Sequence, residues 1–140
     1  MIKLLSILSL LTVIIYSMFL VVDNDQLQES IKRGETVYAT QCASCHMAAG
    51  EGIGGVFPPL AKSDFLLEDR ERSILVLLKG LNEKITVNGK AYSIPMAAQD
   101  YLSDKQISDV LNFVRNTWGN EGKIILPEEV TVLRNKETIK

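Results

Sequence analysis

The chain has 140 residues, with 15 Lys or Arg, 17 Asp or Glu and a formal net charge of −2. This balance gives no support to a nucleic-acid-binding protein, which would need a basic patch or stripe. Two cysteines and one histidine are too few ligands for a structural zinc site, and the length suits one small domain.

The first 22 residues are largely apolar, and Lys3 is the only charged residue among them. From Leu4 to Val22 the run would reach roughly 28 Å as a helix at about 1.5 Å per residue, close to the roughly 30 Å hydrocarbon core of a bilayer. Residues 1–22 are therefore predicted to be a signal peptide or an N-terminal membrane anchor. The end of the run lacks the small residues of a signal-peptide cleavage site, which favours the anchor. Lys3 on one side and acidic residues on the other predict that the following domain lies outside the cytoplasm.

Residues 24–38 predict the first helix of that domain. Leu27, Ile31 and Tyr38 fall close to one face of it. Gly34 interrupts this pattern at a cost of roughly 1 kcal/mol relative to alanine. A close crossing with another helix would explain the glycine.

Cys42, Cys45 and His46 form a Cys-x-x-Cys-His motif. Each thiol can add across one vinyl group of a porphyrin, and the histidine that follows can supply an axial nitrogen to the iron. The motif uses both cysteines and the only histidine of the chain. It therefore predicts one covalently attached haem c and one axial ligand, His46.

Three other interpretations of the motif are less favoured by the sequence. A zinc site would need a second Cys or His pair, which the chain lacks. A thiol oxidoreductase of the thioredoxin type would need a strand before the motif and a βαβ context, whereas the flanking sequence is helical in pattern. A chance occurrence is opposed by the export segment, the helical pattern and a second candidate ligand.

The stretch from the motif to residue 92 predicts three further features. Residues 47–60 contain four glycines and two prolines and predict a loop around the proximal side of the haem. Asp69 is a candidate cap for a short helix that ends at Gly80. Residues 85–92 carry an Asn-Gly turn between short extended arms, which predicts a small β-hairpin.

Met96 is the predicted sixth ligand of the iron. Two of the four methionines lie in the N-terminal segment, and Met47 directly follows His46, so its side chain cannot readily reach the opposite face of the porphyrin. Pro95 restricts the backbone before Met96. Periodicity alone would assign Met96 to the core, and the haem motif reverses that preference. An open sixth site, as in a haem enzyme or gas sensor, remains the alternative.

The last regular element is predicted by a capping box of Ser103 and Gln106. An apolar stripe follows it, and Gly119 is predicted to end the helix. Residues 121–140 carry mixed charge and predict an exposed extension, with or without a short helical piece, and a frayed end.

From about Ser30 to about Leu133 the sequence resembles the class I c-type cytochromes, and within them the small monohaem cytochromes that serve periplasmic dehydrogenases and nitrite reductases. In that group the glycine and aromatic of a Gly-x-x-x-aromatic step, here Gly34 and Tyr38, pack against an aromatic of the last helix, here Phe113.

Two further matches, and one departure, bear on the ligands. The Phe-Pro-Pro-Leu run at 57–60 resembles the family loop whose proline carbonyl accepts a hydrogen bond from the proximal imidazole, which implies Pro59, with Pro58 second. The run Asn-Phe-Val-Arg-Asn-Thr-Trp-Gly-Asn at 112–120 resembles the family's last helix. Many relatives have proline after the ligand methionine, whereas here Pro95 precedes Met96.

The resemblance implies an all-α cytochrome c fold of three to five helices around one covalent haem, with the small hairpin near 85–92. The predicted organisation is 1–22 signal or anchor, 23–120 cytochrome c domain and 121–140 extension. The implied function is one-electron transfer, not enzymatic catalysis, in the periplasm or on the extracytoplasmic face of the inner membrane. The implied partners are a dehydrogenase, a nitrite reductase or a terminal oxidase, and the protein is expected to be a monomer. Apolar residues expected around the haem are Ile53, Leu60, Leu66, Leu78, Val87 and Ile94.

Overall fold

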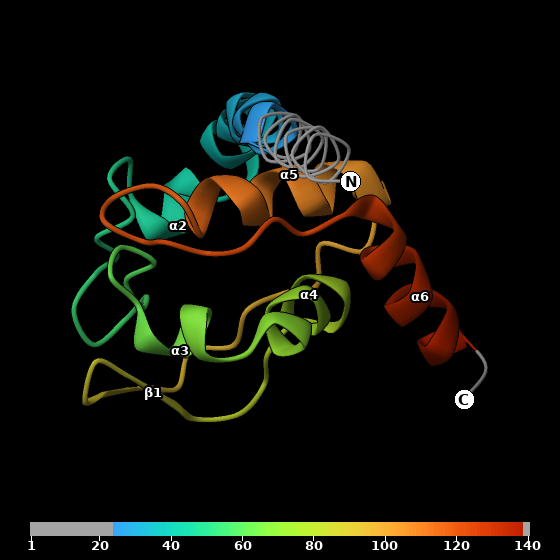
Figure 1. Ribbon diagram of the computed structural model, residues 1–140. Coiled ribbons are helices and arrows are strands. Elements are labelled where there is room, and N and C mark those ends of the chain that lie inside the picture. The colour runs from blue at the N-terminus through green and yellow to red at the C-terminus, as the bar shows by residue number, and fades with distance from the viewer. Residues whose placement is uncertain (1–23, 139–140) are drawn as a thin grey trace, which may run out of the picture.

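The computed structural model describes residues 24–138. The predicted signal or anchor of residues 1–22 lies outside this part of the chain. Within the described part, no helix has both the length and the apolar character needed to cross a bilayer. After a helix over residues 24–41, the elements follow in the order α2 (Ala43–His46), α3 (Asp64–Glu68), α4 (Arg70–Lys79), β1 (Ile85–Val87), β2 (Lys90–Tyr92), α5 (Asp104–Val114) and α6 (Pro127–Thr138) (Figure 1). The predicted mainly helical fold with one small hairpin is confirmed.

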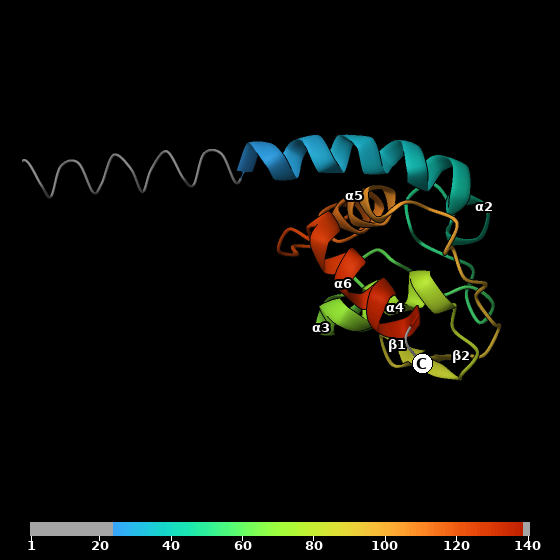
Figure 2. The ribbon, with the colours of Figure 1, turned by 90° about the vertical axis from the view of Figure 1, so that its right-hand side faces the viewer.

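The N-terminal helix, residues 24–41, lies across α5, as Figure 2 shows. At the crossing, a Cβ on Gly34 would lie 1.9 Å from the carbonyl oxygen of Asp109 and 2.8 Å from Cβ of Phe113, so only glycine fits. One turn later the rings of Tyr38 and Phe113 have centroids 5.3 Å apart. The close helix crossing expected for Gly34, and its aromatic partner, are therefore confirmed.

A third aromatic ring completes the packing at this crossing. The Trp118 ring meets Tyr38 at a centroid distance of 5.0 Å and Phe113 at 5.2 Å, both edge-on. Edge-to-face pairs of this kind add about 0.5–1.5 kcal/mol beyond the area that the rings bury. The cluster fixes the end of the N-terminal helix, from which the Cys-x-x-Cys-His motif follows directly.

The short elements between residues 60 and 92 are capped by their own side chains. Ser63 accepts a hydrogen bond from Leu66 N and begins α3, a helix that the sequence pattern did not predict. Asp69 accepts one from Arg72 N at 2.9 Å and begins α4, which ends at Gly80 as expected. The hairpin is antiparallel and turns at Asn88 and Gly89, whose φ angles are 51° and 76°, so the prediction at 85–92 is confirmed.

The last predicted helix is shorter than its apolar stripe suggested. The capping box at Ser103 is present, but α5 ends at Val114, five residues before Gly119. Side chains, in place of backbone N–H groups, donate to carbonyls in the last turn of α5. Asn116 Nδ2 donates to the carbonyl of Asn112 at 2.9 Å, and Thr117 Oγ1 donates to that of Phe113 at 2.8 Å. Such local side-chain bonds compete with helix continuation.

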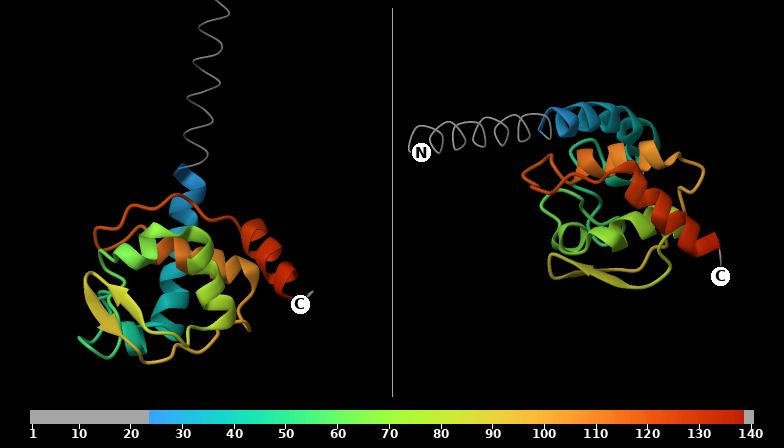
Figure 3. Two further views of the ribbon diagram at one scale, coloured as in Figure 1. Left: turned by 90° about the horizontal axis from the view of Figure 1, so that it is seen from below. Right: turned by 45° about the vertical axis from the view of Figure 1, so that its right-hand side comes forward.

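The C-terminal segment is not an exposed extension, and this prediction was wrong. Ile125, Val130 and Leu133 are buried, with 1%, 0% and 7% of their surfaces exposed. Helix α6 packs beside α4 and α5 (Figure 3). Arg134 joins it to the start of α5, with Nε 2.7 Å from Asp104 Oδ1. Two of these core positions, Val130 and Leu133, lie on α6, and Ile125 lies just before it. The many charged residues of the segment led to the prediction of an exposed extension.

Candidate functional site

Four of the five predicted haem-binding residues, with Pro59 among them, line one apolar pocket. Cys42, His46 and Met96 share a cavity of about 100 Å³ that lies against α4, β1 and α5. An adjoining hollow of about 300 Å³ is lined by the same three residues and by Cys45. Volumes of a few hundred Å³ are usual for small-molecule and cofactor sites. The two hollows thus bring together side chains of the Cys-x-x-Cys-His motif and the side chain of Met96, which follows the hairpin.

The wall of the pocket agrees in part with the predicted lining. Leu60, Leu66 and Val87 line the inner cavity, and Ile94 lines the outer hollow. Ile53 and Leu78 are not among the described residues that line either hollow. Ile53 is 41% exposed, and Leu78 is part of the hydrophobic core. The inner wall is completed by apolar residues that the sequence did not single out, among them Leu77, Leu81, Val110, Leu111 and Val114.

Helical geometry arranges the Cys-x-x-Cys-His motif. Cys42 N bonds to the carbonyl of Tyr38 at 2.9 Å, and His46 N bonds to the carbonyl of Cys42 at 3.0 Å, so the motif continues the helical path for one more turn. Residues four apart on a helix lie on one face, which places His46 beside Cys42. Met47, at a φ of 63°, then turns the chain away. The Tyr38 hydroxyl donates a hydrogen bond to the carbonyl of Met47 at 2.6 Å, which stabilises this turn.

His46 is buried and is oriented by a backbone carbonyl. Its Nδ1 lies 3.0 Å from the carbonyl oxygen of Pro58. A carbonyl can only accept, so Nδ1 carries the proton and Nε2 keeps a free lone pair, the form that binds a metal. Burial lowers the pKa of His46, and the Pro58 bond opposes this in part. The imidazole is therefore neutral near pH 7 and suited to ligate iron.

The carbonyl that meets His46 belongs to Pro58, so the first choice of Pro59 for this bond was wrong. The loop closes back on the motif, because Gly52 N bonds to the carbonyl of His46 at 3.0 Å. A Cβ on Gly52 would lie 2.4 Å from the carbonyl oxygen of Phe57 and 2.7 Å from that of Pro58. This close approach decides which carbonyl reaches the imidazole, whereas Pro59 contributes to the pocket wall.

Met96 is held at the pocket by its backbone. Its N–H donates to the carbonyl of Leu81 at 2.9 Å, and Leu81 N–H donates to the Met96 carbonyl at 2.8 Å. Gly80 permits the approach, since a Cβ there would lie 2.5 Å from the Met96 carbonyl oxygen. Leu81 gave no signal in the sequence as a positioning residue, because its contribution is made by backbone atoms.

The thiol at position 42 is poorly suited to redox catalysis by free cysteines. Burial, with a smaller effect from Cys45, raises the pKa of Cys42 to about 11. Reactive cysteines have lowered pKa values, because the thiolate is the nucleophile. The motif also follows a helix instead of a strand. Both observations oppose the thiol oxidoreductase.

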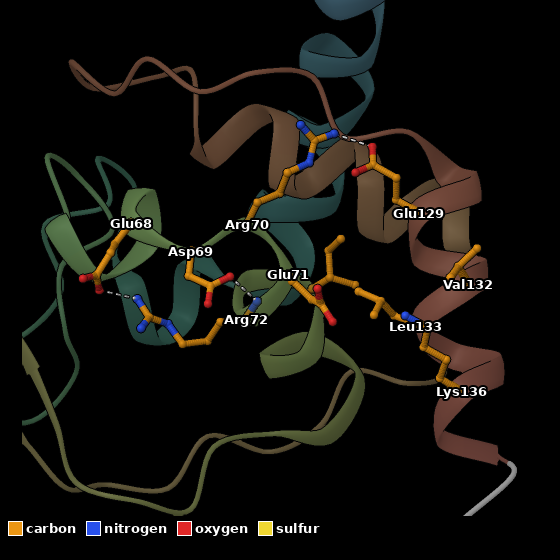
Figure 4. A pocket seen from close by; sticks show the side chains of 10 residues that line it. Glu68, Asp69, Arg70, Glu71, Arg72, Glu129, Val132, Leu133 and Lys136 are labelled. Carbon is orange, nitrogen blue, oxygen red and sulfur yellow. Dashed lines mark hydrogen bonds and ion pairs between the residues drawn. The ribbon is translucent and has the colours of Figure 1, made fainter.

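A larger hollow lies elsewhere. It measures about 740 Å³ and separates α3 and α4 from α6 (Figure 4). Its walls are mainly charged, and several of the charges pair across it or beside it, as Arg70 does with Glu129 and Arg72 with Glu68. It contains none of the cysteine, histidine or methionine side chains, so its size does not make it the site of the predicted chemistry.

The fit of these residues to a covalent haem agrees with comparisons to known proteins. The family model for cytochrome c matches residues 31–118. Cytochrome c-552 of Thermus thermophilus is 42% identical over 113 residues, which cover 74% of this chain and 86% of that protein. The cytochrome c subunit of alcohol dehydrogenase (quinone) from Gluconobacter oxydans is 36% identical over 89 residues, 62% of this chain and 18% of that subunit. The gluconate 2-dehydrogenase cytochrome c subunit of Pantoea cypripedii is 29% identical over 125 residues, 83% of this chain and 28% of that subunit.

Proposed function

The chain belongs to the cytochrome c family, which binds haem c covalently, and from that premise we propose that it is a monohaem one-electron carrier whose iron is ligated by His46 and Met96. One observation carries the proposal: His46, Met96 and Cys42 line a single apolar pocket, although 50 positions separate the two proposed ligands in sequence. Elimination among the methionines identified the same pair independently.

Each residue of the site has a distinct role in this proposal. Cys42 and Cys45 form the two thioether links, and His46 offers Nε2 because Pro58 occupies Nδ1. When bound, the haem supplies an iron centre that gains and loses one electron. The Met96 thioether favours the ferrous form, and the apolar wall disfavours the additional charge of the ferric form. Both contributions raise the reduction potential.

Electron exchange is proposed to occur at the outer hollow. Its lining includes Gln41, Cys45 and Ile94, and Ile94 is 51% exposed. Gln41 ends the N-terminal helix, so the hollow lies at the end of that helix farther from residue 24. The helix rises roughly 27 Å over residues 24–41 at about 1.5 Å per residue. A weak, small interface at this end would suit rapid turnover with a redox partner.

The orientation fits a domain that is tethered at its N-terminal end. We propose that residues 1–22 export the domain and anchor it, and that residues 23–120 form the cytochrome domain on the extracytoplasmic side. Figure 2 shows the start of the N-terminal helix, in blue, at one end of the molecule and α2, which bears His46, toward the other. A tether before residue 24 would thus leave the haem site facing away from the membrane.

A dehydrogenase is the best supported class of redox partner. Two of the three similar proteins named above are cytochrome c subunits of dehydrogenases. One is a subunit of alcohol dehydrogenase (quinone), and the other is a subunit of gluconate 2-dehydrogenase. A nitrite reductase or a terminal oxidase could use the same surface. The domain would act as a monomer in each case.

The test of the ligand assignment is the substitution Met96→Leu, which keeps the side-chain volume and removes the sulfur. We expect covalent haem to be retained and the reduction potential to fall, measured by spectroelectrochemistry on the full chain. Met47→Leu is the matched control, because Met47 does not line either hollow among the described residues. An unchanged potential in Met96→Leu would remove Met96 from the ligand role and favour an open sixth site.

A further inference from the structure

Arg115 is a buried cation without a carboxylate partner among the described residues. Its side chain follows the end of α5, and the residue is only 5% exposed. Nη1 donates to the carbonyl of Leu66 and lies 3.4 Å from Ser73 Oγ. Nε is buried and has no hydrogen-bond partner. Neutral oxygens are therefore the only acceptors that this guanidinium has in the described structure.

The other arginines that contact acidic residues show what Arg115 lacks. Ion pairs join Arg33 to Asp109, Arg70 to Glu129, Arg72 to Glu68 and Arg134 to Asp104. Burial is the largest cause that lowers the pKa of Arg115, repulsion from Arg70 adds to it, and Asp69 opposes both. A guanidinium stays protonated in proteins even so. Burying an unpaired charge is costly, and residues 24–138 provide no ion pair that would compensate for it.

The position of this charge relates it to the proposed haem. Both groups that Arg115 contacts, Leu66 and Ser73, belong to residues that line the pocket of His46 and Met96. Val114, the residue before it, lines the same pocket. The guanidinium therefore lies one residue behind the pocket wall, where apolar surroundings screen it weakly.

We propose that Arg115 sets the reduction potential of the haem: its fixed positive charge behind the pocket wall raises the potential by disfavouring the ferric form. The ferric iron carries one more positive charge than the ferrous iron, so a nearby cation destabilises the oxidised state more. This inference rests on the haem assignment proposed above. Arg115 acts on the iron through the electric field of its charge and is not a ligand of the iron.

The expected effect follows from Coulomb's law. For two unit charges separated by on the order of 10 Å at an effective dielectric constant of about 20, the interaction shifts the ferrous–ferric equilibrium about tenfold. For a one-electron couple a tenfold shift corresponds to about 59 mV.

The first experiment is Arg115→Met in the full-length haem protein. We expect the reduction potential to fall by an amount that corresponds to an approximately tenfold shift of the ferrous–ferric equilibrium. The absorbance spectrum should keep the bands of the wild-type axial ligands. Lys123→Met is the matched control, because Lys123 is an exposed cation next to Gly122, where an added Cβ would lie 3.0 Å from Cβ of Arg115. It should shift the equilibrium less than twofold. An unchanged potential in Arg115→Met with an unchanged spectrum would overturn the proposal.

Arg115→Lys gives a second readout that does not depend on how Arg115→Met folds. It keeps the charge at neutral pH, so the potential should stay near the wild-type value. Burial lowers the pKa of a lysine, so its charge should be lost as the pH rises, and the potential of this variant should fall there relative to the wild type. Arg70 and Asp69, the charged neighbours, are common to both proteins. A constant difference between them at all pH values would contradict a charge effect.

The two proposals fail separately. A wild-type protein without haem absorbance would contradict the cytochrome function. A haem with the expected ligands and a potential indifferent to the charge at position 115 would contradict this inference alone.

Discussion

Asp109 is a buried carboxylate that joins the N-terminal helix to α5. It accepts hydrogen bonds from Ser30 Oγ at 2.6 Å, Arg33 Nε at 2.8 Å and Lys105 Nζ at 3.2 Å. Burial by itself raises its pKa, but these donors outweigh burial and lower it below the usual value. Nothing in the local sequence distinguishes Asp109 from an exposed aspartate, because Ser30 and Arg33 lie more than 70 positions away.

The lowered pKa makes the stability dependent on pH in a defined direction. The stabilisation is fully present above the unfolded-state pKa, about 3.9, and is lost as the pH falls through the lower folded-state pKa. Asp109→Asn should therefore reduce the free energy of unfolding at pH 7 by about 2 kcal/mol, and by less near pH 3. Urea unfolding at the two pH values measures both. Asp100→Asn, at an exposed position, is the control, and equal losses at both pH values would contradict the linkage.

At the scale of elements, the crossing of the N-terminal helix over α5 depends on one missing methyl group. Gly34→Ala would place Cβ 1.9 Å from the Asp109 carbonyl oxygen, a backbone atom within α5 that cannot move alone. We expect a loss of about 3 kcal/mol in the free energy of unfolding, because the helices must separate. Denaturant unfolding of the haem protein measures it.

Gly54→Ala is the control for this prediction. The nearest atom to a Cβ there is Lys90 Nζ at 3.1 Å, the free end of a flexible side chain. Its unfolding free energy should change by less than about 0.5 kcal/mol. If Gly34→Ala were as mild as this control, the crossing would not require glycine.

Helix α6 offers a second comparison at this scale. Leu133 is 7% exposed against the core, whereas Val132, its neighbour in sequence, is 53% exposed. Leu133→Ala should cost about 2–4 kcal/mol of stability through the cavity that it leaves, and Val132→Ala less than about 0.5 kcal/mol. Thermal unfolding of the two variants tests this. Similar melting temperatures would mean that α6 is not part of the folded core in solution.

At the scale of the whole molecule, the proposed tether and cofactor can be tested together. We expect the protein from membranes of an exporting, haem-attaching host to retain residues 1–22 and to carry one haem, as measured by intact mass. The same haem increment on a shortened chain in the soluble fraction would indicate cleavage and a diffusible carrier. A colourless chain without the increment would contradict the cytochrome function and return Cys42 and Cys45 to thiol chemistry.

Features whose interactions are local could be predicted from the residue pattern. The Cys-x-x-Cys-His motif, the capping box at Ser103 and the Asn-Gly turn each lie within five residues, so the pattern specifies the geometry. It also identified Gly34 as a crossing point, because glycine within an amphipathic helix needs a packing reason.

Features that join distant segments depend on how the chain folds. The direction of the Pro58 carbonyl depends on closure of the loop at Gly52, and burial of α6 depends on the face of α5 that it meets. Packing of α3 and α4 against Arg115 gives its guanidinium neutral oxygens, and no carboxylate, as partners within residues 24–138. Such contacts arise from surfaces that the chain brings together only on folding, and residue types alone do not encode which surfaces meet.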